Sequence, residues 1–147
     1  MELSQDFKEF IDLLNAHKVE YLVVGGYAVN NYGYLRATGA IDFWVKPGGN
    51  NAKRIIQALL DFGFGTLDII EDDFTNEDRV VQLGFPPYRI DIMTSVSGLD
   101  FDECWKVKQD VVFEGQEITF ISLHHLKLNK EATGRDKDKL DLKNLPK

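Results

Sequence analysis

The sequence predicts an α/β (α+β) fold in which helices flank a mixed β-sheet. Short β-branched and aromatic runs alternate with longer segments whose apolar residues recur every three or four positions. Turn residues separate two pairs of these runs, which is typical of antiparallel hairpins. The 147 residues contain no internal repeat and no long polar linker, so we expect a single domain over residues 1–147.

The first half of the chain supplies three of the expected helices and two strands. Apolar spacing predicts helices over residues 4–17 and 52–62, and Gly63 is placed to end the second one. The run VEYLVV reads as a buried strand that ends at the pair Gly25-Gly26, and the helical spacing that follows ends near Gly33. The run AIDFWV, residues 40–45, is a second strand. Its alternate residues Ala40, Asp42 and Trp44 should share one face.

The second half supplies two hairpins and three short helices. The strands RVVQLGF and YRIDIMT are separated by Pro86-Pro87, and VVFEGQEITFI turns around Gly115. We expect a helix over residues 99–107, another capped by Ser122, and a last one after Gly134. The acidic stretch 68–78 is predicted to be a solvated, irregular or weakly helical connection.

Charge is distributed unevenly along the chain. The net charge is -7, yet residues 127–147 carry seven basic and four acidic side chains. This basic C-terminal helical segment, about residues 122–147, is a candidate contact for a polyanion, and a solvated helix of mixed charge is the alternative. No run approaches the roughly 20 apolar residues of a membrane span, and the N-terminus lacks a signal-peptide pattern. These features predict a cytoplasmic protein with no membrane partner.

Three features could form a ligand site. The pair Gly25-Gly26 at a strand end would let the backbone approach a phosphate closely. Asp42 and Asp91 each interrupt an apolar strand, where an ionised acid is costly unless it is paired or binds a cation. On adjacent strands they could share a divalent ion. The alternative is plain ion pairing of Asp42 with Arg36 and of Asp91 with Arg89.

The order of these features resembles the nucleotidyltransferase superfamily, which includes polymerase beta, the minimal nucleotidyltransferases and the AbiEii-type toxin family. The segments that carry the resemblance are YLVVGGYAVNNYGYLRAT, IDFWV, VVQLGFPPYRIDIMTS and NKEATGRDKDKLDL. In that superfamily an Asp-x-Asp motif and a third acid hold two Mg²⁺ ions on a nucleoside triphosphate. Here Asp42 matches the second acid and Asp91 the third, whereas Ala40 stands where the first is expected.

The resemblance implies specific roles for these residues. Asp42 and Asp91 would be the catalytic and metal-binding residues, with Asp91, or a water near it, receiving the acceptor proton. The nucleotide would be bound by the glycine pair and by four cations: Arg36, Lys130, Arg135 and Lys137. Ala40 should weaken metal binding and impair transfer.

The implied reaction is transfer of a nucleoside monophosphate from the triphosphate to an acceptor hydroxyl. We expect an RNA 3' end, such as that of tRNA, or a protein hydroxyl, in a toxin-antitoxin or phage-defence system where a toxin or antitoxin is a possible partner. An aminoglycoside or lincosamide acceptor is the small-molecule version. The alternative from another class is a non-catalytic module that binds a nucleotide or a partner protein through a degenerate site.

Overall fold

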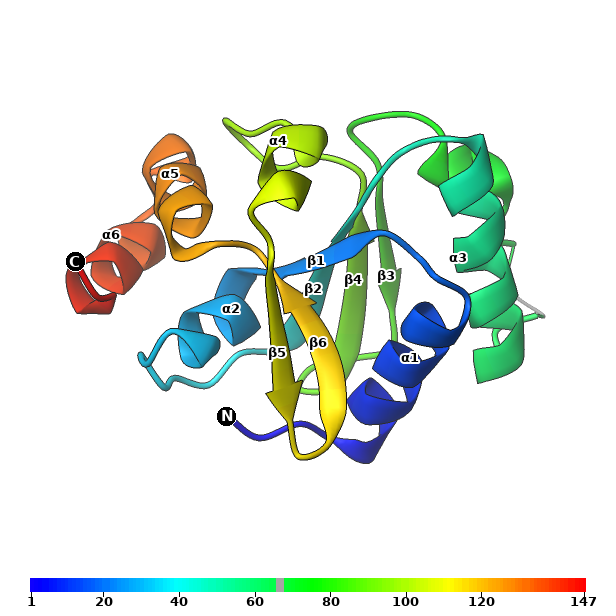
Figure 1. The fold of residues 1–147 in the computed structure, drawn as a ribbon, viewed down its shortest axis with the longest axis horizontal. Helices are drawn as coiled ribbons and strands as arrows, with labels where there is room; N and C mark the ends of the chain where they lie inside the picture. The colour runs from blue at the N-terminus through cyan, green and yellow to red at the C-terminus, as the bar shows by residue number, and fades with distance from the viewer. Residues whose placement is uncertain (66–67) are drawn as a thin grey trace.

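The computed structural model describes residues 1–65 and 68–147, and these residues form one sheet with helices around it (Figure 1). The strands are β1 (Tyr21–Val24), β2 (Ala40–Val45), β3 (Val80–Leu83), β4 (Arg89–Met93), β5 (Gln109–Phe113) and β6 (Gln116–Phe120). The helices are α1 (Gln5–Ala16), α2 (Gly25–Asn31), α3 (Gly49–Phe62), the 3₁₀ helix η1 (Glu71–Phe74), α4 (Phe101–Lys106), α5 (Leu123–Thr133) and α6 (Asp136–Asn144).

The sheet is mixed, as predicted. Its strand order is β3-β4-β2-β1-β6-β5. β2 pairs in parallel with β4 and antiparallel with β1, and the predicted hairpins β3-β4 and β5-β6 are both antiparallel. Strands β2 and β4 are distant in sequence, so their pairing joins the two halves of the chain at the centre of the sheet.

One face of the sheet packs on α1 and α3, which contact each other (Figure 1). Phe10 of α1 lies edge-on to Phe43 of β2, with ring centroids 5.5 Å apart, and also contacts Phe62 of α3. On the other face, Trp44 lies edge-on to Phe101 of α4. Residues of β2 therefore alternate between a closed apolar core and the face that carries Asp42.

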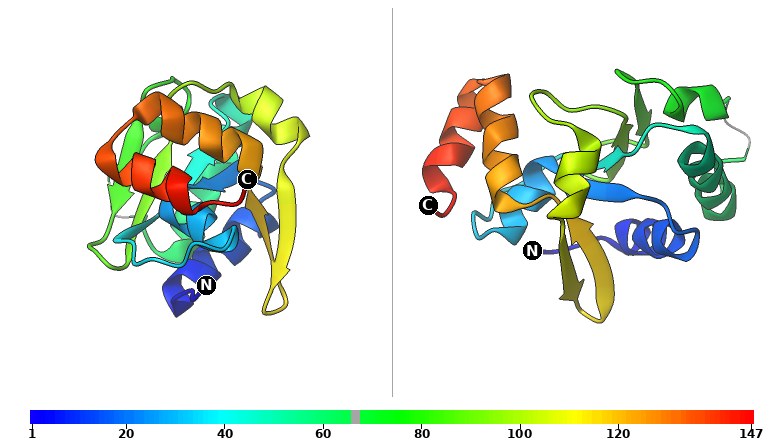
Figure 2. Two further views of the ribbon diagram at one scale, coloured as in Figure 1. Left: turned by 90° about the vertical axis from the view of Figure 1, so that its left-hand side faces the viewer. Right: turned by 45° about the horizontal axis from the view of Figure 1, so that its top comes forward.

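Helices α5 and α6 pack on each other at the end of the molecule opposite α3 (Figures 1 and 2). The Ser122 side chain accepts a hydrogen bond from the His125 amide, as expected of an N-cap, and Gly134 ends α5 in the left-handed conformation. Within the described residues, no helix is long and apolar enough to cross a membrane.

Some boundaries differ from the prediction. Helix α2 begins at the glycine pair itself, and α3 begins at Gly49, three residues earlier than expected. The acidic stretch contains the short helix η1, as the weakly helical alternative predicted, but Phe74 within it is completely buried rather than solvated. Burial of this aromatic ring anchors a segment whose charges alone suggest a solvated connection.

Candidate nucleotide site

The glycine pair is required by its surroundings. Gly25 has a φ of +67°, and a Cβ added there would overlap Oδ2 of Asp42. A Cβ on Gly26 would lie 2.7 Å from Oγ1 of Thr38. The turn from β1 into α2 thus packs directly against the strand that carries Asp42, and a side chain at either glycine would have to displace Asp42 or Thr38.

The two strand-borne acids lie side by side. Asp42 and Asp91 are register partners in the parallel pair β2-β4, so they share the same face of the sheet. Burial, the charge of the neighbouring Asp91 and a hydrogen bond with it together raise the pKa of Asp42 to about 7. The pairing predicted from two lone acids is therefore present.

Asp91 already has a cationic partner. The Arg89 guanidinium donates from Nε to Oδ1 of Asp91 at 2.8 Å and from Nη2 to Oδ2 at 3.0 Å. This is one of the two ion pairs that the sequence left open as an alternative. The other does not form, because Arg36 binds Asp141.

The predicted phosphate-binding cations gather beside the glycine pair, but three of them are paired with carboxylates of α6. Arg36 donates from Nε and Nη2 to Asp141, at 2.7 and 2.8 Å. The Lys130 ammonium lies 3.2 Å from Asp138 and 3.0 Å from Asp141. Arg135 also binds Asp138, at 2.8 Å. Neither acid was predicted to belong to the site, although Asp138 lies three residues after Arg135, a spacing at which side chains of one helix can pair.

Lys137, the fourth predicted cation, is exposed and forms no ion pair with a carboxylate in the described part of the chain. Partial burial and the neighbouring Arg36, Lys130 and Arg135 lower its pKa. Its positive charge also favours the ionised form of Asp42 and so opposes part of the rise in the pKa of that carboxyl. Four cations lie among the paired carboxylates Asp138 and Asp141 and the nearby Asp42, and the remaining surplus of positive charge suits an anionic ligand.

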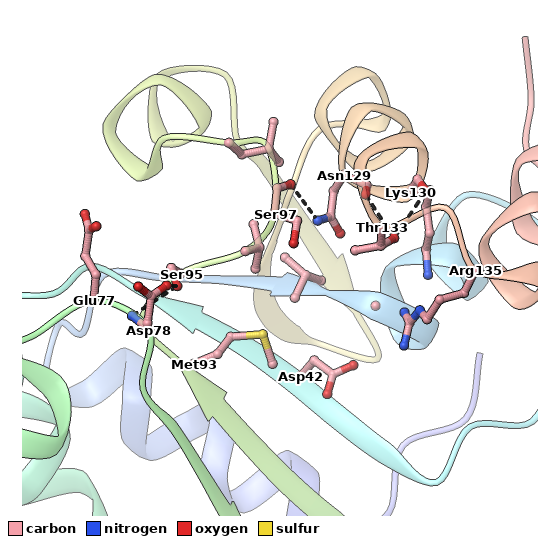
Figure 3. Close-up of a pocket in the computed structure, with 14 residues that line it drawn as sticks. Asp42, Glu77, Asp78, Met93, Ser95, Ser97, Asn129, Lys130, Thr133 and Arg135 are labelled. Atoms are coloured by element: carbon pink, nitrogen blue, oxygen red, sulfur yellow. Dashed lines mark hydrogen bonds between the residues drawn. The ribbon is translucent and has the colours of Figure 1, made fainter.

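A cleft of about 550 Å³ runs along this side of the molecule (Figure 3). Lys130 and Arg135 point toward it above Asp42, whereas Glu77 and Asp78 lie at its other end with Ser95 (Figure 3). Asp78 accepts a hydrogen bond of 2.8 Å from the Ser95 hydroxyl. Glu77 and Asp78 were predicted to lie in a solvated connection, and only the fold shows that they line the same cleft as Asp42.

The residues at the site fit at most one divalent ion, and only with phosphate oxygens and waters as its other ligands. Mg²⁺ in proteins is usually held by one or two carboxylates together with phosphate oxygens and waters, and Asp42 lines the cleft where a phosphate could reach it. The donor set for a second ion is missing, because Ala40 has no side-chain oxygen and both oxygens of Asp91 accept from Arg89. Within the described residues, no group of three or more His, Cys, Asp or Glu side chains could hold a metal.

Comparison with solved structures identifies the fold. No protein-family model matches the sequence, and no curated protein sequence matches it significantly. Among solved structures, a Thermotoga maritima protein assigned as a nucleotidyltransferase is 18% identical, with a TM-score of 0.64 over 92% of this chain and 87% of that one. The lincosamide antibiotic adenylyltransferase LnuA, solved with lincomycin bound, is 16% identical, with a TM-score of 0.58 over 97% of this chain and 95% of that one. The chain therefore has the nucleotidyltransferase fold.

Proposed function

We propose that the protein is a nucleotidyltransferase that transfers a nucleoside monophosphate from a triphosphate to an acceptor hydroxyl. The observation that carries the proposal is the position of Asp42. Asp42 lies against Gly25 and beside Asp91. It also lines a cleft, and the end of that cleft nearest to it is rich in cations. This is the arrangement that the transfer reaction needs, with a carboxylate between a phosphate-binding region and open space for an acceptor.

In the proposed reaction the acceptor oxygen forms a bond to the α-phosphorus while the bond from that phosphorus to the bridging oxygen breaks and pyrophosphate leaves. Asp42 is better placed than Asp91 to receive the acceptor proton, because Asp42 lines the cleft and Asp91 is bound by Arg89. Lys137 and the surplus charge around Lys130 would balance the phosphate charge. A divalent ion, when bound at Asp42, would add positive charge against the phosphates.

For the acceptor, we favour a small molecule that is neutral or positively charged near its hydroxyl. Glu77 and Asp78 line the end of the cleft that is left for the acceptor, and they would repel a polyanion. The neighbour LnuA is an adenylyltransferase of lincosamide antibiotics, so its acceptor is a small molecule. The second candidate is an RNA 3' end or a protein hydroxyl in a toxin-antitoxin or phage-defence system, which is favoured by the basic segment 127–147.

The test is transfer of label from α-phosphate-labelled nucleoside triphosphates with Mg²⁺. The acceptor panel would contain lincosamides, aminoglycosides, tRNA and a mixed protein substrate. We expect weak transfer by the unaltered chain and at least about a hundredfold gain in Ala40→Asp, because a second carboxylate two residues from Asp42 points to the same side of the strand. The matched control Ala40→Asn has nearly the same shape without the charge and should gain nothing.

Asp42→Asn in the Ala40→Asp background should abolish any gain. If Ala40→Asp binds the triphosphate yet transfers label to none of these acceptors, the non-catalytic binding module is the better description. In that case the missing carboxylate at Ala40 and the pairing of Asp91 with Arg89 would be the features that favour a non-catalytic module.

A further inference from the structure

A smaller side pocket of about 180 Å³ adjoins the acceptor end of the cleft. Glu77, Ser95 and Leu99 line both the cleft and this side pocket. Trp44 also lines the side pocket, and it lies two residues along β2 from Asp42, on the same face of the sheet and roughly 7 Å away. A pocket that encloses a whole drug-sized ligand usually measures about 300 to 1,000 Å³, so the side pocket fits one part of a ligand that also occupies the cleft.

The buried part of the side pocket contains a hydrogen-bond donor without a partner. Trp44 is 1% exposed, and its Nε1 has no acceptor among the described residues. A buried indole N–H usually finds a partner, because an unpaired donor has lost its hydrogen bonds to water. The other buried residues of the lining need no partner: the Thr94 hydroxyl bonds the backbone of Arg79, and Phe101 packs edge-on against the indole. A ligand oxygen in the side pocket would supply the acceptor that Trp44 lacks.

The exposed part of the side pocket is acidic. Glu77, Asp100 and Asp102 line it together with one cation, Lys46. Lys46 is paired with Asp102 at 3.0 Å, and Asp100 accepts a hydrogen bond from the Glu103 amide. Glu77 forms no ion pair within the described part of the chain. Three carboxylates against one ammonium favour a positively charged group of a ligand.

We propose that the side pocket binds a protonated amino group of the acceptor, and that the acceptor is a small amino alcohol. Its hydroxyl reacts beside Asp42, its amine lies near Glu77, and a second oxygen accepts a hydrogen bond from Trp44. Glu77 and Trp44 then determine which acceptor binds, without taking part in the transfer. This inference rests on the proposed function, but binding of an amine can be measured without a nucleotide and without transfer.

The probe is tetrahydrofurfurylamine, a five-membered ring ether that carries a protonated amine. Binding to the full ¹⁵N-labelled chain is followed by the indole N–H signals of its two tryptophans in a proton–nitrogen correlation spectrum. Trp105→Phe leaves the signal of Trp44 and so assigns it. We expect a saturable shift of the Trp44 proton to lower field, with a dissociation constant in the millimolar range for so small a ligand.

Two matched probes separate the charge from the oxygen. Tetrahydrofurfuryl alcohol has the same ring without the charge and should bind at least about tenfold more weakly. Cyclopentylmethylamine keeps the charge but lacks the ring oxygen, so it should bind without moving the Trp44 proton to lower field.

Glu77→Gln should weaken binding of tetrahydrofurfurylamine about threefold to fivefold, which is the effect of losing one exposed charge pair. The matched control is Glu71→Gln, which changes an exposed acid of η1 outside the linings of the cleft and the side pocket. It should leave binding unchanged.

Equal binding of the amine and the alcohol, or unchanged binding in Glu77→Gln, would overturn the proposal. A Trp44 proton that does not move in the presence of tetrahydrofurfurylamine would also overturn it. Amine binding as expected, without nucleotidyl transfer to any acceptor, would leave the amine site in place and refute the proposed function alone. Transfer to RNA or protein without amine binding would refute the amine site alone.

Discussion

Gly25 combines a left-handed backbone with direct contact to the Asp42 carboxylate. From its place in the sequence, this glycine is predicted to let a ligand approach, whereas the structure shows that the closest group is an acid of the chain itself. That contact depends on the antiparallel register of β1 and β2, in which Val24 faces Asp42. A sequence can show a glycine at a strand end and an acid 17 positions later, but it cannot show that the two strands bring them together.

We expect Gly25→Ala to lower the free energy of unfolding by about 2 to 4 kcal/mol, because the new methyl group adds overlap with Asp42 to the cost of a left-handed backbone. Urea denaturation followed by circular dichroism measures the change. Gly134→Ala is the matched control: its φ of +60° is similar, but the nearest atom to its new Cβ lies 3.6 Å away. It should cost only about 1 to 2 kcal/mol, from the backbone alone. Equal effects of the two substitutions would show that Asp42 moves aside freely.

At the level of elements, most helices and strands follow from local patterns, whereas the polar contacts between them do not. The strand at residues 40–45 and the caps at Ser122 and Gly134 were predicted because they depend on neighbouring residues. The partner of Arg36, in contrast, is Asp141, 105 residues away. Many acids were available to Arg36, and only the packing of α6 near the start of β2 decides among them.

The contact between α5 and α6 should make stability sensitive to acid. Asp138 is fully buried, and although burial disfavours its charge, hydrogen bonds from Arg135, Thr133 and Lys130 outweigh this and lower its pKa. A lowered pKa in the folded state stabilises the protein fully above the unfolded value of about 3.9, and the stabilisation is lost as the pH falls below it. We therefore expect the free energy of unfolding, measured in urea from pH 7 to pH 2.5, to fall steeply below about pH 4.

Asp138→Asn should flatten this dependence and lower stability at pH 7 by about 3 to 5 kcal/mol, since it leaves the buried Lys130 without one of its partners. Asp136→Asn, an exposed change of the same kind in the same helix, should have an effect below about 1 kcal/mol. An unchanged pH profile in Asp138→Asn would mean that other acids determine the loss of stability.

For the whole molecule, the cleft has two ends of opposite charge. The sheet supplies Asp42, the C-terminal helices supply Lys130 and Arg135, and the segment after η1 supplies Glu77 and Asp78. Charge segregation of this kind orients a ligand with an anionic and a neutral or cationic part. The net charge of -7 does not reveal this segregation, because the positive charges at one end of the cleft and the negative charges at the other cancel when they are added.

A nucleoside triphosphate at about a hundred times its dissociation constant should stabilise the fold by about 2.7 kcal/mol, which corresponds to a rise in Tm of about 5 to 10 °C. Differential scanning fluorimetry measures the shift, and the nucleoside without phosphates should produce little. Lys137→Gln removes an exposed cation whose charge acts on Asp42, and it should reduce the shift by at least half. Lys139→Gln, the same change two residues along α6, should not. No shift with any triphosphate would contradict nucleotide binding.

The bond between Arg36 and Asp141 ties the connection before β2 to the last helix. A protease cut near Gly134 that released α6 would leave all six strands and their hydrogen bonds in place. It would nevertheless strip two enclosed cations, Arg36 and Lys130, of their counter-ions, so a nicked chain should keep its sheet while its ligand pocket loosens first.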